Sequence, residues 1–231
     1  MKTLFGKTPL IVGCIGSAAL LRRCAKKAPA DCDMVEVRLD LTGPCGGKWI
    51  DLCAALRKRG MPVLLTIRSD REGGEWHGGE ADRMALYLAG LKSVSAVDME
   101  IAAPRLAPLA QAAHKCGVKV VGSFHDFGAT PTLARLAAVE IRGRTMGADV
   151  VKIAAMVKTP RDLARLYAVP TQAKGPICVL GMGQRGSVSR VALPCAGSCL
   201  AYGSLEEATA PGQWNCLNLA KELSRWGVRK R

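Results

Sequence analysis

The sequence predicts a single-domain (β/α)8 barrel over residues 1–231, and three observations predict it. Eight apolar segments of strand length recur along the chain, with amphipathic stretches of helix length between them. The segments are continuous runs of Val, Ile and Leu, which is typical of parallel strands covered on both faces. Polar side chains gather where the segments end, the edge at which barrel enzymes carry their active sites. An open doubly wound sheet is the alternative, because strand order cannot be read from sequence.

The strands and the clearest helices follow in order. The strands are expected at residues 10–15, 34–39, 63–68, 96–101, 119–124, 150–154, 177–182 and 198–202. Helices are expected where apolar residues recur at helical spacing, at residues 49–59, 81–92, 105–116, 133–146 and 161–167. Gly60, Gly117 and Gly147 each stand just before a strand, where a glycine ends the preceding helix. Thr159 followed by Pro160 predicts a helix start, because threonine caps a helix and proline fits its first turn.

Size and composition fit one such domain and exclude several classes of protein. The 231 residues are 49% hydrophobic, 23% charged and only 4% aromatic, which is ordinary globular usage rather than that of a disordered or fibrous chain. Lys and Arg number 33 against 19 Asp and Glu, which gives a net charge of +14. The basic residues are spread along the chain without a nucleic-acid-binding motif, so we expect a basic surface that attracts a small anion and no nucleic acid.

Cysteine usage and the N-terminal residues predict a cytoplasmic protein. The chain has ten cysteines, and several, including Cys14 and Cys199, sit in apolar runs where a free thiol behaves as a small hydrophobe. There is no Cys-x-x-Cys and no paired histidine spacing, so no metal site is expected. The apolar run at residues 9–21 is too short to cross a bilayer. Arg22 and Arg23 follow it where an export signal has its neutral cleavage region.

Lys152 is the most informative single residue, because it lies inside the apolar strand expected at 150–154. Strand alternation puts Val150, Lys152 and Ala154 on one face, and either face of a parallel sheet is buried. Burial lowers the pKa of a lysine and leaves a neutral amine that can attack a carbonyl. The alternative is an ammonium paired with a carboxylate at a strand end. Position alone leaves both open.

His125 comes directly after the strand expected at 119–124. An imidazole at a strand end, opposite a lysine, is a natural proton carrier near neutral pH. A structural histidine bonded to the backbone is the alternative. His77 lies in a glycine-rich loop and His114 in a helical stretch, so we expect both at the surface.

Further charged residues stand at the ends of two other strands. Glu36, Arg38 and Asp40 alternate and are expected to face the same way, while Arg68 and Glu72 lead into a glycine-containing turn. Arginines in such a cavity suit a substrate that carries a carboxylate or hydroxyl groups, because the guanidinium donates forked hydrogen bonds. Salt bridges among these residues are the alternative.

The segment 181–186 has the spacing Gly-x-Gly-x-x-Gly after a strand. This spacing also occurs in dinucleotide-binding folds, but there it opens a domain with further strands to come, and here only one strand follows. We therefore expect no nicotinamide or flavin cofactor.

Taken together, these segments resemble the type I 3-dehydroquinate dehydratases, the Schiff-base dehydratases of the shikimate pathway. The resemblance runs from the first expected strand to Gln213, in the order of the family. It is carried by EVRLD at 36–40, TIRSDREGG at 66–74, DME at 98–100, SFHDF at 123–127, GADVVKIA at 147–154, MGQRGSVSR at 182–190 and APGQ at 210–213.

The resemblance implies a homodimeric barrel that converts 3-dehydroquinate to 3-dehydroshikimate and water, without a metal or an organic cofactor. Lys152 matches the Schiff-base lysine of the family, His125 its proton-transfer residue, and Glu72 the carboxylate near that histidine. The substrate-binding positions of the family fall on Glu36, Arg38, Arg68, Met182, Arg190, Thr209 and Gln213.

Two positions depart from the family pattern. Thr209 stands where the family often has serine, and it keeps the hydroxyl. Gly13 is nearest to a position where some members carry a substrate-contacting serine, so one contact is expected to be lost or supplied otherwise.

Two other functions fit part of the pattern. A class I aldolase, or another imine-forming barrel enzyme, would share Lys152 but would not require His125, Arg190 and Gln213. A basic binding protein on a barrel scaffold would require none of them for catalysis.

Overall fold

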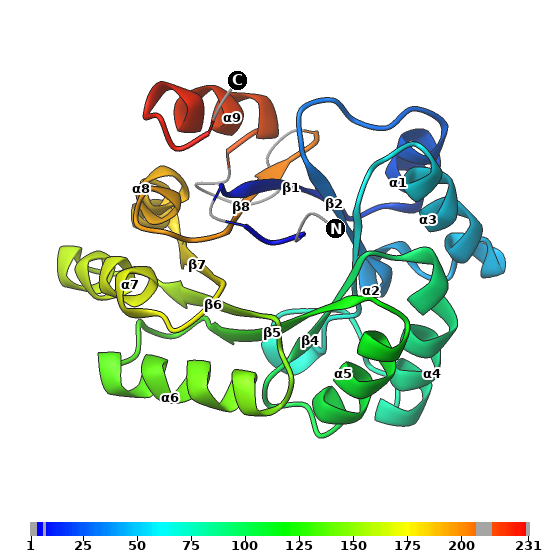
Figure 1. Cartoon of the computed structure of the whole chain (residues 1–231), viewed down its shortest axis with the longest axis horizontal. Coiled ribbons are helices and arrows are strands. Elements are labelled where there is room, and N and C mark those ends of the chain that lie inside the picture. The colour runs from blue at the N-terminus through cyan, green and yellow to red at the C-terminus, as the bar shows by residue number, and fades with distance from the viewer. Residues whose placement is uncertain (1–3, 7, 207–213, 230–231) are drawn as a thin grey trace.

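A computed structural model describes residues 4–6, 8–206 and 214–229, and it confirms the predicted barrel (Figure 1). The eight strands are β1 Leu10–Ile15, β2 Met34–Arg38, β3 Val63–Thr66, β4 Ala96–Glu100, β5 Lys119–Asp126, β6 Val150–Met156, β7 Ile177–Met182 and β8 Leu200–Ser204. They form one parallel sheet in the order β7-β6-β5-β4-β3-β2-β1-β8. The pairing of β1 with β8 rules out the open doubly wound alternative.

The two edge strands of this sheet, β7 and β8, close the ring. The backbone N–H of Cys199 donates to the carbonyl oxygen of Ile177 at 2.7 Å. The Ser198 hydroxyl accepts from the N–H of Val179 at 3.0 Å. Because these bonds lie at the start of the two strands, they bring the first and last parts of the barrel together.

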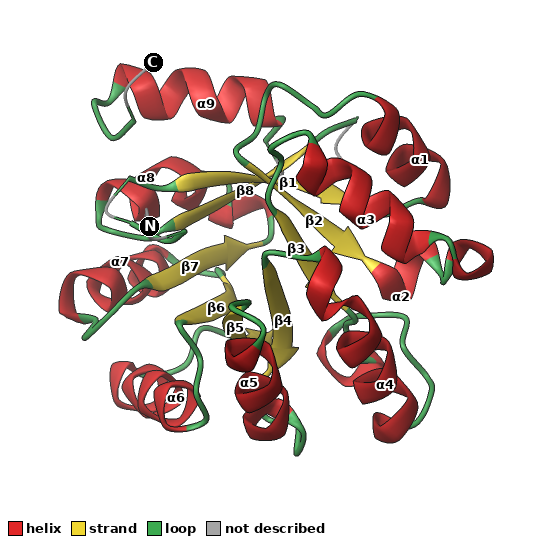
Figure 2. Ribbon diagram, turned by 45° about the vertical axis from the view of Figure 1, so that its right-hand side comes forward, coloured by secondary structure: helices red, strands yellow, loops and turns green. Residues whose placement is uncertain are grey.

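Helices surround the sheet on its outer side (Figure 2). They are α1 Ala18–Lys26, α2 Leu39–Thr42, α3 Trp49–Lys58, α4 Glu80–Gly90, α5 Leu106–Lys115, α6 Leu133–Thr145, α7 Pro160–Gln172, α8 Ser189–Cys195 and α9 Cys216–Arg225, with 3₁₀ turns at Cys45–Gly47, Asp70–Glu72, Leu91–Ser93 and Gln184–Gly186. No helix of the described ranges combines the length and the apolarity that crossing a bilayer requires. All ten cysteines are free thiols.

The helix ends confirm the predicted capping residues. Gly60, Gly117 and Gly147 have φ angles of 79°, 70° and 93°, the left-handed conformation that ends a helix at low cost only for glycine. Thr159 caps α7: its hydroxyl accepts from the N–H of Asp162 at 3.3 Å, and the Asp162 carboxylate accepts from the N–H of Thr159 at 2.8 Å.

Strand alternation divides the apolar residues into two cores. Outward-facing residues pack beneath the helices, among them Ile11, Val37, Leu65, Val151 and Ile153. Inward-facing residues fill the lower barrel, among them Val12, Met34, Leu64, Val121, Val150, Leu200 and, from the N-terminal segment, Phe5. The predicted split of Val150 and Ala154 from Val151 and Ile153 is thus confirmed. Toward the strand C-terminal ends the inward-facing residues become polar.

Candidate active site

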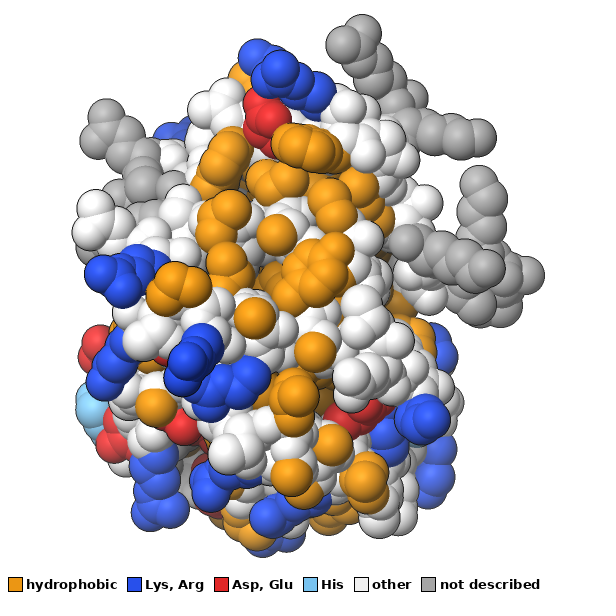
Figure 3. Space-filling view, turned by 90° about the vertical axis from the view of Figure 1, so that its left-hand side faces the viewer, with side chains coloured by type: hydrophobic (Ala, Val, Ile, Leu, Met, Phe, Trp, Pro, Cys, Tyr) orange, Lys and Arg blue, Asp and Glu red, His pale blue; other side chains and the backbone are white. Residues whose placement is uncertain are grey.

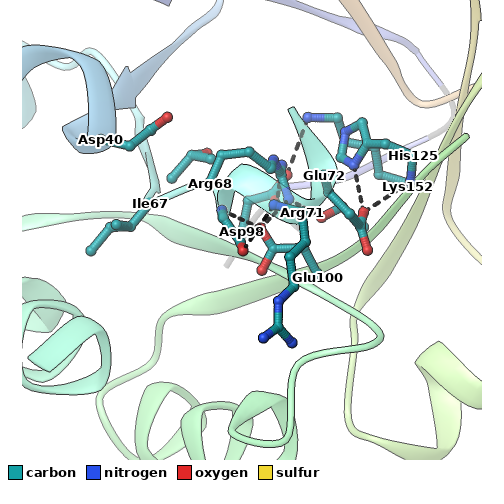
Figure 4. Close-up of polar contacts among 12 residues, drawn as sticks. Asp40, Ile67, Arg68, Arg71, Glu72, Asp98, Glu100, His125 and Lys152 are labelled. Carbon is teal, nitrogen blue, oxygen red and sulfur yellow. Dashed lines mark hydrogen bonds and ion pairs between the residues drawn. The ribbon is translucent and has the colours of Figure 1, made fainter. Parts of the chain in front are cut away.

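A ring of polar side chains lies directly above the apolar floor of the barrel. Each inward-facing residue of this ring is two positions beyond an apolar floor residue on its strand. The polar members are Cys14, Glu36, Thr66, Asp98, Ser123, Lys152 and Tyr202, from β1, β2, β3, β4, β5, β6 and β8. Figure 4 shows Lys152, His125, Glu72, Arg68, Asp98 and Glu100 pointing toward one another.

Lys152 is buried in this ring and is paired with carboxylates. Its Nζ lies 3.2 Å from Asp98 Oδ2 and 3.5 Å from Glu36 Oε1. Burial lowers the pKa of Lys152, but Asp98 and Glu36 raise it by more, so the pKa lies above its ordinary value. Of the two alternatives left open by the sequence, the pairing with carboxylates is the one that the structure shows, and this pairing favours the charged amine.

Arg68 is also committed to carboxylates inside the barrel. Its guanidinium donates to Asp98 at 2.7 Å, to Glu100 at 3.1 Å and to the Ser123 hydroxyl at 2.6 Å. Arg83 donates to the other oxygen of Glu100 at 2.7 Å. The salt-bridge alternative holds for Arg68, and this network fixes the Asp98 carboxylate that faces Lys152.

Glu72 and His125 form the second part of the site. Glu72 Oε2 accepts from the backbone N–H of His125 at 3.0 Å, and it lies 2.9 Å from the imidazole Nδ1. His125 faces inward from β5, because it is two positions beyond Ser123, which pairs in register with Lys152. The imidazole and the amine therefore come from neighbouring strands and face the same interior.

Burial moves the pKa values of Glu72 and His125 in opposite directions. Burial, followed by the charges of Arg68 and Lys152, holds the pKa of His125 well below 6.5. Burial also raises the pKa of Glu72 to about 7; the charge of Arg68 opposes this increase, and the weaker effect of Glu100 adds to it. His125 is thus uncharged near neutral pH, as a general base must be.

The loop after β3 places Glu72. Ser69 caps the turn Asp70–Glu72, with its hydroxyl accepting from the N–H of Arg71 at 3.3 Å. Gly73 follows with φ 76°, and the ring of Phe127 covers it so closely that a Cβ would lie 2.4 Å away. Phe127 in turn stacks on the His125 ring at 6.4 Å between centroids. Through Phe127, the loop that carries Glu72 therefore packs against the end of β5 that carries His125.

Three more predicted residues stand around the same barrel mouth. Arg38 ends β2 and forms a two-bond pair with Asp40, at 3.0 and 2.6 Å. Met182 ends β7 and packs against the inner core. Arg190 lies in the first turn of α8; its Nε is buried without a partner, and it forms no ion pair with a residue of the described ranges.

Comparison with known proteins decides the family. A model of the Type I 3-dehydroquinase family matches residues 14–226. The chain belongs to this family. The resemblance stated from the motifs is confirmed.

Relatives in this family span nearly the whole chain. The chain is 37% identical to the 3-dehydroquinate dehydratase of Methanosarcina barkeri, over 86% of this chain and 87% of the relative. It is 35% identical to that of Thermodesulfovibrio yellowstonii, over 85% and 87%. Among solved structures, the 3-dehydroquinate dehydratase of Geobacillus kaustophilus superposes with a TM-score of 0.86 at 28% identity, covering 98% of this chain and 94% of the other. The type I enzyme of Clostridium difficile, with a TM-score of 0.86 at 26% identity over 96% and 93%, is described with covalently modified comenic acid.

Other predictions about this family's site have different outcomes. Thr209 and Gln213 lie outside the described residues. Gly13 faces the helices, since a Cβ there would lie 2.7 Å from the Leu205 side chain. The inward-facing residue at this strand end is Cys14, whose thiol donates to Glu36 at 3.4 Å. The expectation that one substrate contact is lost at Gly13 or supplied otherwise stays a prediction.

The two remaining histidines lie at the surface as expected, and the glycines of residues 181–186 form a tight turn. His77 and His114 are exposed. A Cβ on Gly186 would lie 2.5 Å from the backbone of Gly181, so these glycines serve the close packing of a turn on the end of β7. In the described part of the chain, no three His, Cys, Asp or Glu residues are grouped as a metal would require.

Sequence reasoning missed three site residues. Asp98, Cys14 and Tyr202 all touch the lysine or its carboxylates. Asp98 could have been found from the same signal as Lys152, a charged residue inside an apolar strand. Cys14 and Tyr202 carry no such signal, because both types are ordinary in buried strands.

Proposed function

We propose that this chain converts 3-dehydroquinate into 3-dehydroshikimate and water through an imine on Lys152. The observation that carries the proposal is a buried amine held between two carboxylates, with an uncharged imidazole on the neighbouring strand. Membership of the type I 3-dehydroquinase family supports the same reaction. No metal or organic cofactor enters the proposed steps.

The paired carboxylates set the course of imine formation. Lys152 rests as an ammonium, so it must give up a proton before it attacks the substrate's C3 ketone, and Asp98 and Glu36 lie within reach of that proton. The imine that follows is protonated and carries the positive charge the ammonium had. The same carboxylates stabilise it, and the cation withdraws electrons from the adjacent C2–H bond.

His125 then moves the proton. With Nδ1–H donating to Glu72, the Nε2 lone pair is free to accept the C2 proton, and an enamine forms. The electron pair returns to expel the C1 hydroxyl, which takes the proton back from His125 and leaves as water. Hydrolysis of the imine releases the product and restores Lys152.

The proposed role of each substrate-binding residue depends on whether it already has a partner within the protein. Arg190 meets no carboxylate of the described residues, and burial lowers its pKa, so a substrate carboxylate would relieve an unpaired cation. Arg38 and Glu36 are assigned to ring hydroxyls, together with Thr209 and Gln213, and Met182 to an apolar wall. Arg68 acts from beneath, by holding Asp98.

We further propose that the protein works as a single-domain homodimer in the cytoplasm, on a small molecule and without nucleic acid. Large hydrophobic side chains are exposed on the helices α6, α7 and α9 and at the start of α8, among them Ile141, Tyr167, Val188, Leu217 and Trp226. Figure 3 shows hydrophobic side chains gathered in a band over this side. Such a patch supports association, and sedimentation at micromolar concentration should give twice the chain mass.

Borohydride reduction in the presence of 3-dehydroquinate tests the proposed function. The parent should gain a covalent mass on Lys152 and should form the conjugated product without added metal. Lys152→Ala should lose both, and Lys158→Ala, which removes an exposed lysine of the following loop, should lose neither. An adduct that forms only with aldol substrates would favour the aldolase alternative, and an unmodified parent would favour a binding protein.

A further inference from the structure

Tyr202 brings a hydroxyl group into the polar ring of the barrel. It faces inward from β8 and is 5% exposed, and its oxygen is buried with no hydrogen-bond partner among the described residues. The other hydroxyl and thiol groups of the ring all donate to a carboxylate, from Cys14, Thr66 and Ser123. Burying a hydroxyl without a partner costs about 1–3 kcal/mol. An unpaired buried hydroxyl is explained if its hydrogen-bond partner is a molecule that the free protein lacks, such as a bound substrate.

The ring of Tyr202 contacts the reactive amine. Lys152 Nζ lies 4.3 Å from the ring centroid, over the face where a cation is attracted to the π electrons. The nitrogen is thus held by two carboxylates and one aromatic face. The hydroxyl extends from the edge of the same ring. A carbon that becomes bonded to Nζ is therefore attached to a nitrogen that lies against this ring.

The hydroxyl of Tyr202 keeps its proton near neutral pH. Burial raises the pKa of Tyr202 well above its ordinary value, and the nearby carboxylate of Glu36 raises it further. Phenolate formation is therefore disfavoured. The Tyr202 hydroxyl is therefore an O–H donor that forms no hydrogen bond with any described residue.

We propose that Tyr202 donates a hydrogen bond to the substrate's ketone oxygen during imine formation, an inference that rests on the proposed function. As Nζ adds to the carbonyl carbon, an N–C bond forms and the C=O electron pair moves to oxygen, where the Tyr202 hydroxyl stabilises the developing charge. The C–O bond then breaks and the oxygen leaves as water. Its two protons are those that the ammonium nitrogen gives up, and the imine keeps the third. Tyr202 is unchanged at the end of the step.

Tyr202→Phe separates the hydroxyl from the ring, because the phenyl face remains to hold Lys152. The measurement uses His125→Ala, in which the imine should form and hydrolyse without elimination. Loss of ¹⁸O from the labelled C3 ketone, above the rate in buffer, then reports imine formation alone. We expect adding Tyr202→Phe to slow this loss by about 10²- to 10³-fold, since removing one such donor has an effect of this order. The midpoint of thermal unfolding should stay level or rise, because a buried unpaired hydroxyl is removed.

Tyr167→Phe is the matched control, since this hydroxyl is carried by the exposed face of α7. It should change neither the ¹⁸O loss nor the midpoint. Equal ¹⁸O loss with and without Tyr202→Phe would overturn the role of Tyr202. So would a lower midpoint for Tyr202→Phe, because it would show a hydroxyl already bonded within the free protein. If His125→Ala itself exchanges no faster than buffer, the imine mechanism fails, and the fault lies with the proposed function.

Discussion

At the scale of the residue, the position of one proton between Glu72 and His125 decides what the imidazole can do. An ionised Glu72 accepts a hydrogen bond from Nδ1–H, and the lone pair of Nε2 is then available to accept a proton from the substrate. A protonated Glu72 donates to Nδ1 instead, which puts the ring proton on Nε2 and removes the base. The two groups share the contact at 2.9 Å, so they titrate as a unit.

This coupling predicts the acid limit of turnover. Because the pKa of Glu72 is raised to about 7, kcat/KM of the parent should fall as the pH drops through about 7. A glutamine at this position can accept from Nδ1–H at every pH, so Glu72→Gln should move the limit below pH 6.5, toward the pKa of His125 itself. Rates at saturating and limiting substrate from pH 5 to 8.5 measure it. An unmoved limit in the variant would assign the titration to another group.

His125 itself should be needed for elimination and not for capture of the ketone. His125→Ala leaves Lys152 and both of its carboxylates in place, so borohydride should still trap the adduct. Turnover should fall by about 10²–10⁴-fold, the usual contribution of a positioned acid–base group. Steady-state rates and mass spectrometry of the trapped protein give the two values. A variant that turned over at the parental rate would remove His125 from the proton transfer.

The sequence could predict which residues are reactive better than it could predict their charge. Lys152 and His125 stand out along the chain, because a charged residue in an apolar strand must have a reason. Whether the amine is neutral depends on how many carboxylates face it. Asp98 and Glu36 come from strands far apart in sequence, and only the closed barrel brings them to Lys152. The salt bridges of Arg68 to Asp98 and Glu100 could not be predicted for the same reason.

At the scale of the element, the loop after β3 shows how backbone geometry places a catalytic side chain. The Trp76 N–H donates to the Arg68 carbonyl at 3.1 Å, so the loop folds back on the strand end. This return is also why β3 ends at Thr66, earlier than the sequence predicts. Gly74 passes so close that a Cβ would lie 2.0 Å from the Arg68 oxygen.

Gly74→Ala should therefore displace Glu72 from His125. We expect kcat/KM to fall on the order of 10²-fold, which is typical when a catalytic group moves by about 1 Å. Gly79→Ala is the control in the same loop, because its Cβ would meet nothing closer than 3.4 Å. It should keep activity within about twofold. Equal losses in both variants would point to general loosening of the loop rather than to the Gly74 contact.

Helices that the sequence did not predict were missed for different reasons. All eight strands were predicted, because each is an apolar run bounded by polar residues. Helix α1 follows β1 almost at once, so its apolar residues merged with the strand in a single run. Helix α8 is seven residues long and contains Pro194, which hides the helical spacing. β5 and β6 extend to Asp126 and Met156 because each pairs with a neighbour beyond its apolar part.

At the scale of the whole molecule, the charged groups that make the barrel interior reactive also lower the stability of the fold. An apolar floor holds the lower half, and the upper half confines cations and carboxylates that are costly to bury. Arg68 and Lys152 offset this for Asp98, whose pKa they hold well below its ordinary value against the effect of burial. For Glu72, the charge of Arg68 and the hydrogen bond from the His125 N–H do not outweigh burial, so its ionised form is destabilised in the folded protein.

That strain should be visible in the pH dependence of unfolding. The pKa of Glu72 is about 7 in the folded protein and 4.5 ordinarily, so the folded state binds this proton more tightly. Its carboxyl therefore lowers the free energy of unfolding progressively as the pH rises from 4.5 to 7, and by the full amount above 7. At about 1.4 kcal/mol per pKa unit, the loss reaches up to about 3 kcal/mol.

Glu72→Gln cannot ionise, so its stability relative to the parent should grow by this amount between pH 4.5 and pH 8. Urea unfolding of both proteins at several pH values measures the difference. His125 contributes with the opposite sign, since a depressed histidine pKa favours the folded state above about pH 6.5, but it is present in both proteins. The difference therefore reports the Glu72 carboxyl together with its coupling to His125. A constant difference across the range would show that burial does not strain Glu72, and the acid limit of turnover near pH 7 would then belong to a different group.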